Sequence, residues 1–274
     1  MAALVTCALL GPRSGRFVEG QAVDLPQQSV IFQTLGTLIL WFGWYGFNGV
    51  STLYIANYAG VAAHTMVTTT IAAGTCCLAT ATLGKIVEGH VTPSNANNGV
   101  LAGLVSITAG CSTVAPEGAF LIGLIGAPIF YFSNKMLLKL KVDDVVSAVP
   151  VHGFCGIWGV IAAGLFATEE YYSAAYYSAR AADCAGLFYG GGAMLGANIM
   201  LVLFVIVWTG VCTLVIVLPL KMFGMLRVSA DVEEIGMDDS KHGGAVDTLS
   251  RTVFFKSMKK DLGGGVVAAA RISF

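Results

Sequence analysis

Charged residues are scarce in this chain of 274 residues, where Asp, Glu, Lys and Arg make up 11% and hydrophobic residues make up 56%. A soluble domain usually carries about 25% charged residues, and this chain cannot enclose so much apolar surface within itself. The formal net charge of −1 offers no basic surface to a nucleic acid. The composition therefore predicts a polytopic membrane protein without a nucleic-acid partner.

Metal-binding and redox patterns are also missing from the sequence. The seven cysteines show no CxxC spacing and no pairing with histidine, and most of them lie in apolar runs. Cysteines in such positions are typical of small core residues. The sequence predicts no metal site and no cofactor.

The start of the chain lacks the order of a secretory signal. MAALVTCALLGPRSGR is apolar for ten residues and then basic, whereas a signal peptide carries its positive charge first. This order is typical of the end of a helix that began upstream. We expect residues 1–28 to hold a remnant of a preceding helix and a cytoplasmic loop.

Six apolar segments follow, and a membrane span needs roughly 20 such residues. Together they predict an all-α, polytopic helical bundle with a transmembrane domain over residues 29–226 and a cytoplasmic tail over residues 227–274. The third segment is the shortest. The predicted spans are about Val30–Gly49, Leu53–Leu83, Gly99–Gly110, Ala119–Leu138, Val145–Ala167 and Ala193–Leu226.

The distribution of lysine and arginine tests this count, because cytoplasmic loops are enriched in both. With six spans, 14 of the 15 basic residues fall on the side that holds both chain ends, and only Arg180 falls on the other. Both ends are therefore predicted to be cytoplasmic. An alternative with five spans, which drops the third, places Lys135 and Lys141 on the opposite side from Lys85 and fits less well.

Two polar segments complete this topology. The loop 168–192 is acidic and rich in tyrosine, and we expect it to be solvated on the outer side. In the tail, SRTVFFKSMKK (250–260) mixes apolar and basic residues. That composition fits either a helix on an anionic membrane surface or a disordered tail.

His152 is the most informative residue of the chain. It lies in VVSAVPVHGFCGIWGVIAAGLFA (145–167), which is long enough to cross a membrane and contains no charged residue. An ionisable side chain at mid-span marks a functional site by default. A neutral imidazole facing a narrow pore can accept a proton from a cation or form a hydrogen bond with a small neutral solute. The alternative is a structural histidine bonded to a carbonyl of a neighbouring helix.

A second group of candidates lies in LGTLILWFGWYGFNGVS (35–51), which includes Trp44, Phe47 and Ser51. Aromatic residues at a membrane interface usually form a belt. Aromatic faces also attract cations by about 0.5–2 kcal/mol. An aromatic mouth leading to a buried histidine therefore suits a small cation.

Three other polar residues have structural interpretations. Asp143 and Asp144 stand where the fifth segment begins, and acids there cap free amides and complement the helix dipole. His64 lies in YAGVAAHTMVTTT (58–70). In this Ala- and Thr-rich stretch, we expect it to form a hydrogen bond to a neighbouring helix and to have no pore role.

Several long motifs, in order, resemble those of the ammonium transporter (Amt/Rh) family, and of its ammonium-transporter branch. The resemblance runs from about residue 9 to residue 246. It rests on LGTLILWFGWYGFNGVS (35–51) for the sixth helix, NNGVLAGLVSITAGC (97–111) for the eighth, VDD (142–144) with VPVHGFCGIWGVIAAGLFA (149–167) for the tenth, and LRVSADVEEIGMDDSKHGGA (226–245) for the start of the cytoplasmic tail.

The resemblance implies an eleven-helix inverted-repeat fold that assembles as a homotrimer, most often in the plasma membrane, and conducts ammonium or ammonia through a pore in each protomer. By position, His152 matches the second of two mid-pore histidines. Phe47 matches the second of two phenylalanines that block the outer entry. Ser51 matches a serine that recruits the cation, and Trp44 matches a pore-lining tryptophan.

Part of the family pattern has no counterpart in this sequence. ALLGPR (8–13) resembles the end of the fifth helix, and the first pore histidine, the first gate phenylalanine, the cage tryptophan and an aspartate important for transport are absent. His64 does not replace the first histidine, because it lies on the match to the seventh helix. We expect about six helices, the second half of the family fold with its last helix.

Three hypotheses about function result. The chain is a fragment of an ammonium transporter, or it is a short product that assembles with full-length transporters and regulates them. The third hypothesis is an intramembrane hydrolase that uses Ser51 and His152. GVSTL around Ser51 lacks the nucleophile elbow of a hydrolase, which counts against the third.

Overall fold

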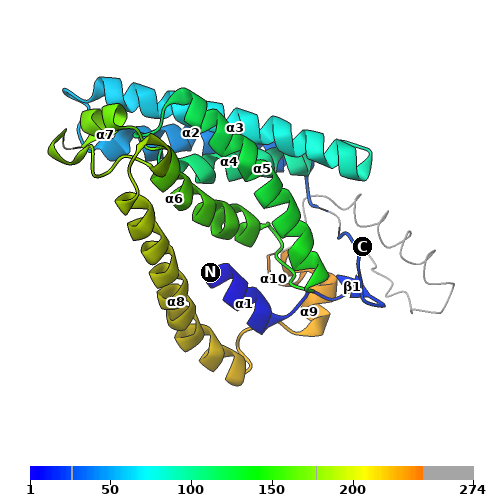
Figure 1. The fold of residues 1–274 in the computed structure, drawn as a ribbon. Coiled ribbons are helices and arrows are strands. Elements are labelled where there is room, and N and C mark those ends of the chain that lie inside the picture. The colour runs from blue at the N-terminus through cyan, green and yellow to red at the C-terminus, as the bar shows by residue number, and fades with distance from the viewer. Residues whose placement is uncertain (26, 177, 243–274) are drawn as a thin grey trace.

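The computed structural model describes residues 1–25, 27–176 and 178–242, and helices dominate it (Figure 1). The long helices are α2 (Val30–Gly49), α3 (Ala59–Glu88), α4 (Pro93–Thr108), α5 (Pro116–Lys139), α6 (Cys155–Phe166) and α8 (Ala193–Met222). The shorter elements are α1 (Ala2–Leu10), β1 (Phe17–Val18), β2 (Gln21–Ala22), η1 (Val50–Thr52), η2 (Val149–Phe154), α7 (Glu169–Ala175), η3 (Ser178–Arg180), η4 (Leu187–Tyr189), α9 (Ala230–Ile235) and α10 (Met237–Lys241).

Five of the six predicted spans are long and apolar enough to cross a bilayer. They are α2 with η1, α3, α5, η2 with α6, and α8. The third, α4, has 16 residues. That corresponds to about 24 Å of helix, against a hydrocarbon core of about 30 Å. The structure confirms the all-α polytopic bundle, and a complete crossing by α4 stays a prediction.

Several of the predicted segment bounds differ from the helices: α4 begins at Pro93 instead of Gly99, and α5 begins at Pro116 instead of Ala119. Three further differences have a local reason. The second span begins at Ala59 instead of Leu53, because the backbone at Leu53 and Asn57 adopts a positive φ and breaks the helix. The fifth begins at Val149 instead of Val145, after a positive φ at Ser147. The sixth ends at Met222 instead of Leu226, just before a turn with a positive φ at Gly224.

The core lies between α3, α4, α5 and α6. The short helix α4 is central: it packs against α2, α3, α5 and α6, and eight of its 16 residues are buried. Three apolar clusters fill the core. One of them contains Ala72 of α3, Ile107 of α4, Ile122 of α5 and Phe166 of α6. The bundle therefore forms around α4.

Helix α8 is attached to this core at one side. It packs against α6 and against α1, and Val217 is the only buried residue of its 30. In Figure 1, α8 and α1 lie below α6, on the opposite side from α3. The long apolar surface of α8 is therefore left to lipid or to other protein.

Hydroxyl side chains and proline start several helices, as their positions in the sequence favour. Ser29 accepts a hydrogen bond from the amide of Phe32 at the start of α2, and Thr92 accepts one from Asn95 before Pro93 opens α4. Such caps satisfy amides that a helix start leaves free. Helix α3 ends at Gly89, whose φ of 82° favours glycine.

The division into residues 1–28, 29–226 and 227–274 stays a prediction. The first region contains α1 and the β1–β2 hairpin, and α9 and α10 follow the last span. The segment 250–260, predicted to lie either on a membrane surface or in a disordered tail, falls outside the described residues.

Candidate functional site: a groove and an aromatic helix end

The backbone that carries His152 is a π-helix, η2, which runs into the regular helix α6. Pro150 has no amide proton, so it cannot make the usual backbone bond of an α-helix. The amide of Cys155 instead donates to the carbonyl of Pro150, five residues earlier. Wide turns of this kind are rare and frequently occur at functional sites.

His152 faces a groove of about 480 Å³ between η2, α6, α8 and α1. Apolar residues such as Leu4, Val160 and Leu201 form most of its wall, and His152 has the only ionisable side chain among the 13 residues that line it. The imidazole is exposed to this groove. Within the part of the chain that the structure describes, its ring nitrogens take part in no hydrogen bond.

The four glycines near His152 divide into two roles. Gly153 and Gly156 line the groove beside the histidine. Gly159 and Gly164 instead allow close packing, since a Cβ atom would lie 2.6 Å from the Ser106 carbonyl at the first and 2.7 Å from the Leu195 Cα at the second. The first two glycines therefore form part of the groove wall, and the last two allow other segments to pack closely against the helix.

Trp44, Phe47 and Ser51 lie together at the end of α2 and in η1. The Trp44 and Phe47 rings meet edge to face at 5.8 Å, and the Ser51 hydroxyl donates to the Phe47 carbonyl. Trp44 Nε1 also donates to Thr108 Oγ1 of α4, at 2.8 Å. The Phe47 ring is 62% exposed, so it remains available for contacts outside the bundle.

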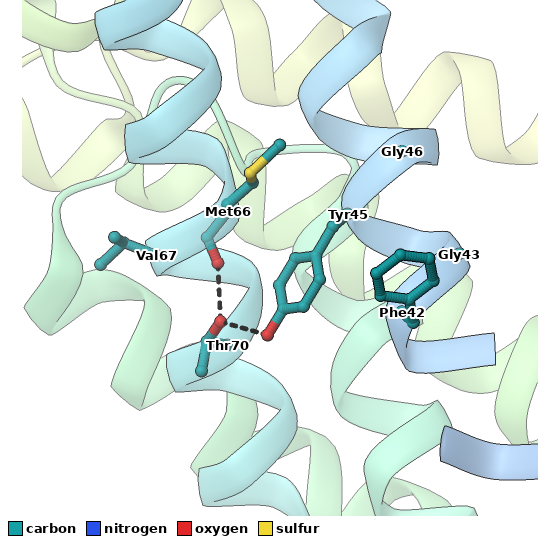
Figure 2. Close-up of a pocket in the computed structure, with 7 residues that line it drawn as sticks. All are labelled: Phe42, Gly43, Tyr45, Gly46, Met66, Val67 and Thr70. Atoms are coloured by element: carbon teal, nitrogen blue, oxygen red, sulfur yellow. Dashed lines mark hydrogen bonds between the residues drawn. The ribbon is translucent and has the colours of Figure 1, made fainter. Parts of the chain in front are cut away.

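Two other aromatic residues of α2, Phe42 and Tyr45, line a shallow apolar groove of about 540 Å³ between α2 and α3. Figure 2 shows Tyr45 crossing this groove, with its hydroxyl 2.7 Å from Thr70 Oγ1. Thr70 in turn donates to the carbonyl of Met66. Phe42 forms the opposite wall and is highly exposed. Tyr45 therefore links α2 to α3 through a hydrogen bond, and Phe42 faces outward.

The structure does not bring all the predicted site residues together. Helix α4 packs against both α2 and α6 and separates the aromatic end of α2 from the helix that follows His152. In the described residues, Ser51 bonds its own helix while His152 faces the α1–α8 side, so no Ser–His pair is formed. The same residues contain no group of three metal-ligating side chains.

Asp144 and Asp143, predicted at the helix start, have different partners. Asp144 accepts a hydrogen bond from the amide of Val149, at 2.6 Å, where η2 begins. Asp143 instead accepts from Arg13, at 2.7 Å from Nε to Oδ2 and 3.0 Å from Nη2 to Oδ1, and Arg16 Nε lies 3.3 Å away. Burial alone raises the pKa of the Asp143 carboxyl. The Arg13 hydrogen bonds and the two guanidinium charges outweigh that effect and hold the pKa below its ordinary value.

His64 has the kind of partner expected of a structural histidine. Its Nε2 lies 2.9 Å from the carbonyl oxygen of Val114, in the connection between α4 and α5. Its ring also stacks on Tyr171 of α7, with 4.1 Å between the ring centroids. The predicted outer loop is therefore anchored to α3 at this point.

Sequence reasoning missed one contact near the chain's polar end. The amide of Ser14 donates to Glu233 in α9, at 2.7 Å, and Arg227 donates to the same carboxylate through Nε and Nη2. These bonds from Ser14 and Arg227 hold the pKa of Glu233 below its ordinary value. The residues are 219 positions apart, and no local pattern in the sequence indicates such a pairing.

The fold and the groove together define a polytopic helical membrane protein with an intramembrane imidazole. A family profile described as "Ammonium Transporter Family" matches residues 1–246. The chain therefore belongs to the ammonium transporter family, whose members are transporters and not enzymes as a class.

Known relatives and solved structures agree with this assignment. "Ammonium transporter 1 member 2" of Oryza sativa subsp. japonica is 39% identical over 246 residues, which cover 85% of this chain and 49% of that protein. A structure titled "Sensor Amt Protein" has a TM-score of 0.77 at 28% identity and covers 88% of this chain and 56% of its own. The Candida albicans Mep2 structure has a TM-score of 0.74 at 26% identity, over 84% and 50%. The chain thus spans about half the length of the relatives it matches.

Proposed function

We propose that this chain forms one side of a path that conducts ammonium or ammonia across a membrane, with His152 as the polar group of that path. The observation that carries the proposal is the groove in which one imidazole faces an otherwise apolar wall. Family membership supports the choice of substrate. The chain covers about half the length of its relatives, so the proposal concerns the part of the path that these residues supply.

The residues named above have distinct roles in this proposal. Ammonium is recruited near Ser51 at the outer face, where the exposed Phe47 ring closes the entry and Trp44 supports it. The cation loses its proton before it enters the apolar section, because a charge is costly there. Ammonia then passes His152, which exchanges hydrogen bonds with it and can relay the proton.

The expected assembly and location follow from the same reasoning. We propose a homotrimer in the plasma membrane, with both chain ends in the cytoplasm. Family membership supports the trimer, and the strong bias of basic residues toward one side supports the orientation.

The test is a chimera in which residues 1–246 replace the corresponding half of the rice relative. Uptake of ammonium and the accompanying current are measured in cells without their own ammonium transporters. His152→Ala should change uptake or the charge carried per substrate. The matched control is His90→Ala, at an exposed position beyond the end of α3, and it should behave like the parent chimera. Uptake and currents equal to those of the parent in the His152→Ala chimera would refute the role of His152.

A second candidate function rests on the length of the chain. Because the chain spans about half the length of its relatives, it could act without transport of its own, as a subunit that joins full-length transporters and regulates them. Co-expression of a tagged chain with a full-length transporter tests this alternative. Co-purification in one complex, with altered uptake, supports it, and a chain that is absent from all transporter complexes contradicts it.

A further inference from the structure

Two hydrogen bonds hold the backbone at the start of the π-turn η2. Asp144 Oδ2 accepts the amide proton of Val149 at 2.6 Å. The amide of Val151 donates to the carbonyl of Ser147 at 3.0 Å. Since Pro150 between them has no amide proton, these two bonds account for the amides of Val149 and Val151 at this helix start.

The residue before the turn is also held in place. Ser147 has a φ of 55°, in the left-handed region that a residue with a side chain rarely adopts. Its hydroxyl donates to Asn134 Oδ1 of α5 at 3.1 Å. The start of the π-turn is therefore fixed by contacts outside the helix, and Asp144 is the one charged group among them.

The register of this turn decides which side chain faces the groove. Successive residues of a helix are about 100° apart around its axis, and a π-turn contains one residue more than the α-helical turn it replaces. If η2 relaxed to an α-helix, the side chains within it would rotate by about that angle. His152 now faces the groove, whereas its neighbour Val151 is 2% exposed and packs in the core.

We propose that Asp144 is a positioning residue for His152: by accepting the Val149 amide it holds η2 in the π register that turns the imidazole into the groove. A charge-assisted bond of this length is among the stronger ones that a helix start can make. The importance of the position rests on the proposed function, but the register itself does not. Its test therefore uses the backbone and the groove and needs no transport assay.

The first measurement is hydrogen exchange of the Val149 amide in the wild-type chain, in lipid nanodiscs. A persistent bond to Asp144 should slow exchange by about tenfold or more relative to an unstructured peptide. Exchange at the unstructured rate would overturn the proposal. This measurement uses no substitution, so it does not depend on the folding of a variant.

The second measurement reads the register by cross-linking across the groove. His152→Cys and Val151→Cys are each combined with Val205→Cys of α8, which lines the same groove as His152, and treated with a bifunctional thiol reagent. Trypsin then gives the peptides 142–180 and 181–221, and mass spectrometry detects the link between them. In the wild-type background, the cysteine at position 152 should link and the cysteine at 151 should not. The parent with its seven native cysteines sets the background.

Asp144→Ala should reverse this preference, so that position 151 gains the link and position 152 loses it. Asp144→Asn keeps an acceptor oxygen and should retain the wild-type pattern. The matched control is Asp24→Ala, which removes a fully exposed acid and should also retain it. An unchanged pattern in Asp144→Ala, or the same reversal in Asp144→Asn, would refute the role of the hydrogen bond.

Discussion

At the residue scale, Asp143 forms a buried ionic contact with two arginines. The Asp143 side chain is 3% exposed, and the side chains of Arg13 and Arg16 are 38% and 11% exposed. Two hydrogen bonds from Arg13 match the two carboxylate oxygens. This group joins the segment after α1 to the loop that leads into η2, and so it supports the backbone next to His152.

Asp143→Asn should destabilise the protein by about 2–3 kcal/mol, because it removes the buried counter-charge of the Arg16 guanidinium and leaves only the exposed Asp24 beside it. The value lies below the full cost of a buried pair, since Arg13 can still reach water. Thermal unfolding in nanodiscs measures the change. Asp24→Asn, at an exposed acid that also contacts Arg16, is the control and should leave the transition unchanged.

The same pair predicts a dependence of stability on pH. The pKa of Asp143 is lower in the folded chain than its ordinary value. Its stabilising contribution is therefore complete above the unfolded pKa of about 3.9 and is lost as the pH falls through the folded pKa. The stability difference between wild type and Asp143→Asn should be constant near neutral pH and shrink below about pH 4. A difference that already shrinks between pH 7 and pH 6 would contradict this origin.

Local sequence patterns predict the role of some of these residues and not of others. An Ala- and Thr-rich surrounding indicated a hydrogen bond from His64 to a neighbouring helix, and the bond is instead made to Val114 in the connection between α4 and α5. An acid before a helix indicated a cap, which fits the bond of Asp144 to Val149. It gave no sign of the Arg13–Asp143 pair, because those residues are 130 positions apart and meet only when the bundle has formed.

At the scale of elements, helices α3, α4 and α5 meet at the backbone of Ala72. A Cβ atom at Gly103 of α4 would lie 2.5 Å from the Ala72 carbonyl oxygen, and a Cβ atom at Gly123 of α5 would lie equally close. Small residues allow helices to approach this closely in lipid. The contact fixes the position of α4 in the centre of the bundle.

Gly103→Ala should therefore destabilise the bundle by about 1–3 kcal/mol, since the added methyl group forces two helix backbones apart. Gly74→Ala is the matched control, on α3 near the same contact, where an added Cβ meets nothing within 4 Å. It should stabilise the helix by about 0.5–1 kcal/mol. Thermal unfolding of the two variants measures both effects. Equal behaviour of the two variants would show that the close contact at Ala72 is not limiting.

The sequence predicts where apolar helices lie better than how their ends are built. The first predicted span, Val30–Gly49, coincides with α2, since apolar length alone locates it. Hydropathy does not distinguish a π-turn from an α-helix, so it missed η2 around His152. It also located only part of α4, whose polar first turn begins at Pro93.

At the scale of the whole molecule, the basic residues divide the chain into two faces. The connections between α2 and α3, between α4 and α5, and between α6 and α8 contain Arg180 as their only lysine or arginine. The remaining basic residues lie at the opposite ends of the helices or in the tail. Such a bias sets the orientation of a membrane protein during insertion.

Protease protection tests this orientation. In sealed vesicles with the outer membrane face outward, added trypsin should cut after Arg180, which is exposed in η3. Sites such as Lys141 and Arg227 should stay intact until detergent opens the vesicles. Cleavage at Lys141 before detergent, with Arg180 protected, would reverse the predicted orientation. Tryptic peptides identified by mass spectrometry report both results.

Helices α3 and α8 each contain 30 residues, or about 45 Å of helix against a hydrocarbon layer of about 30 Å. Helix α3 ends with Lys85 and Glu88, so this end can extend among lipid headgroups. Helix α8 has no charged residue before Lys221, so its excess length requires tilt or a thicker bilayer. A change in membrane thickness should therefore change the tilt of α8 relative to α6. The width of the groove that His152 faces should change with this tilt.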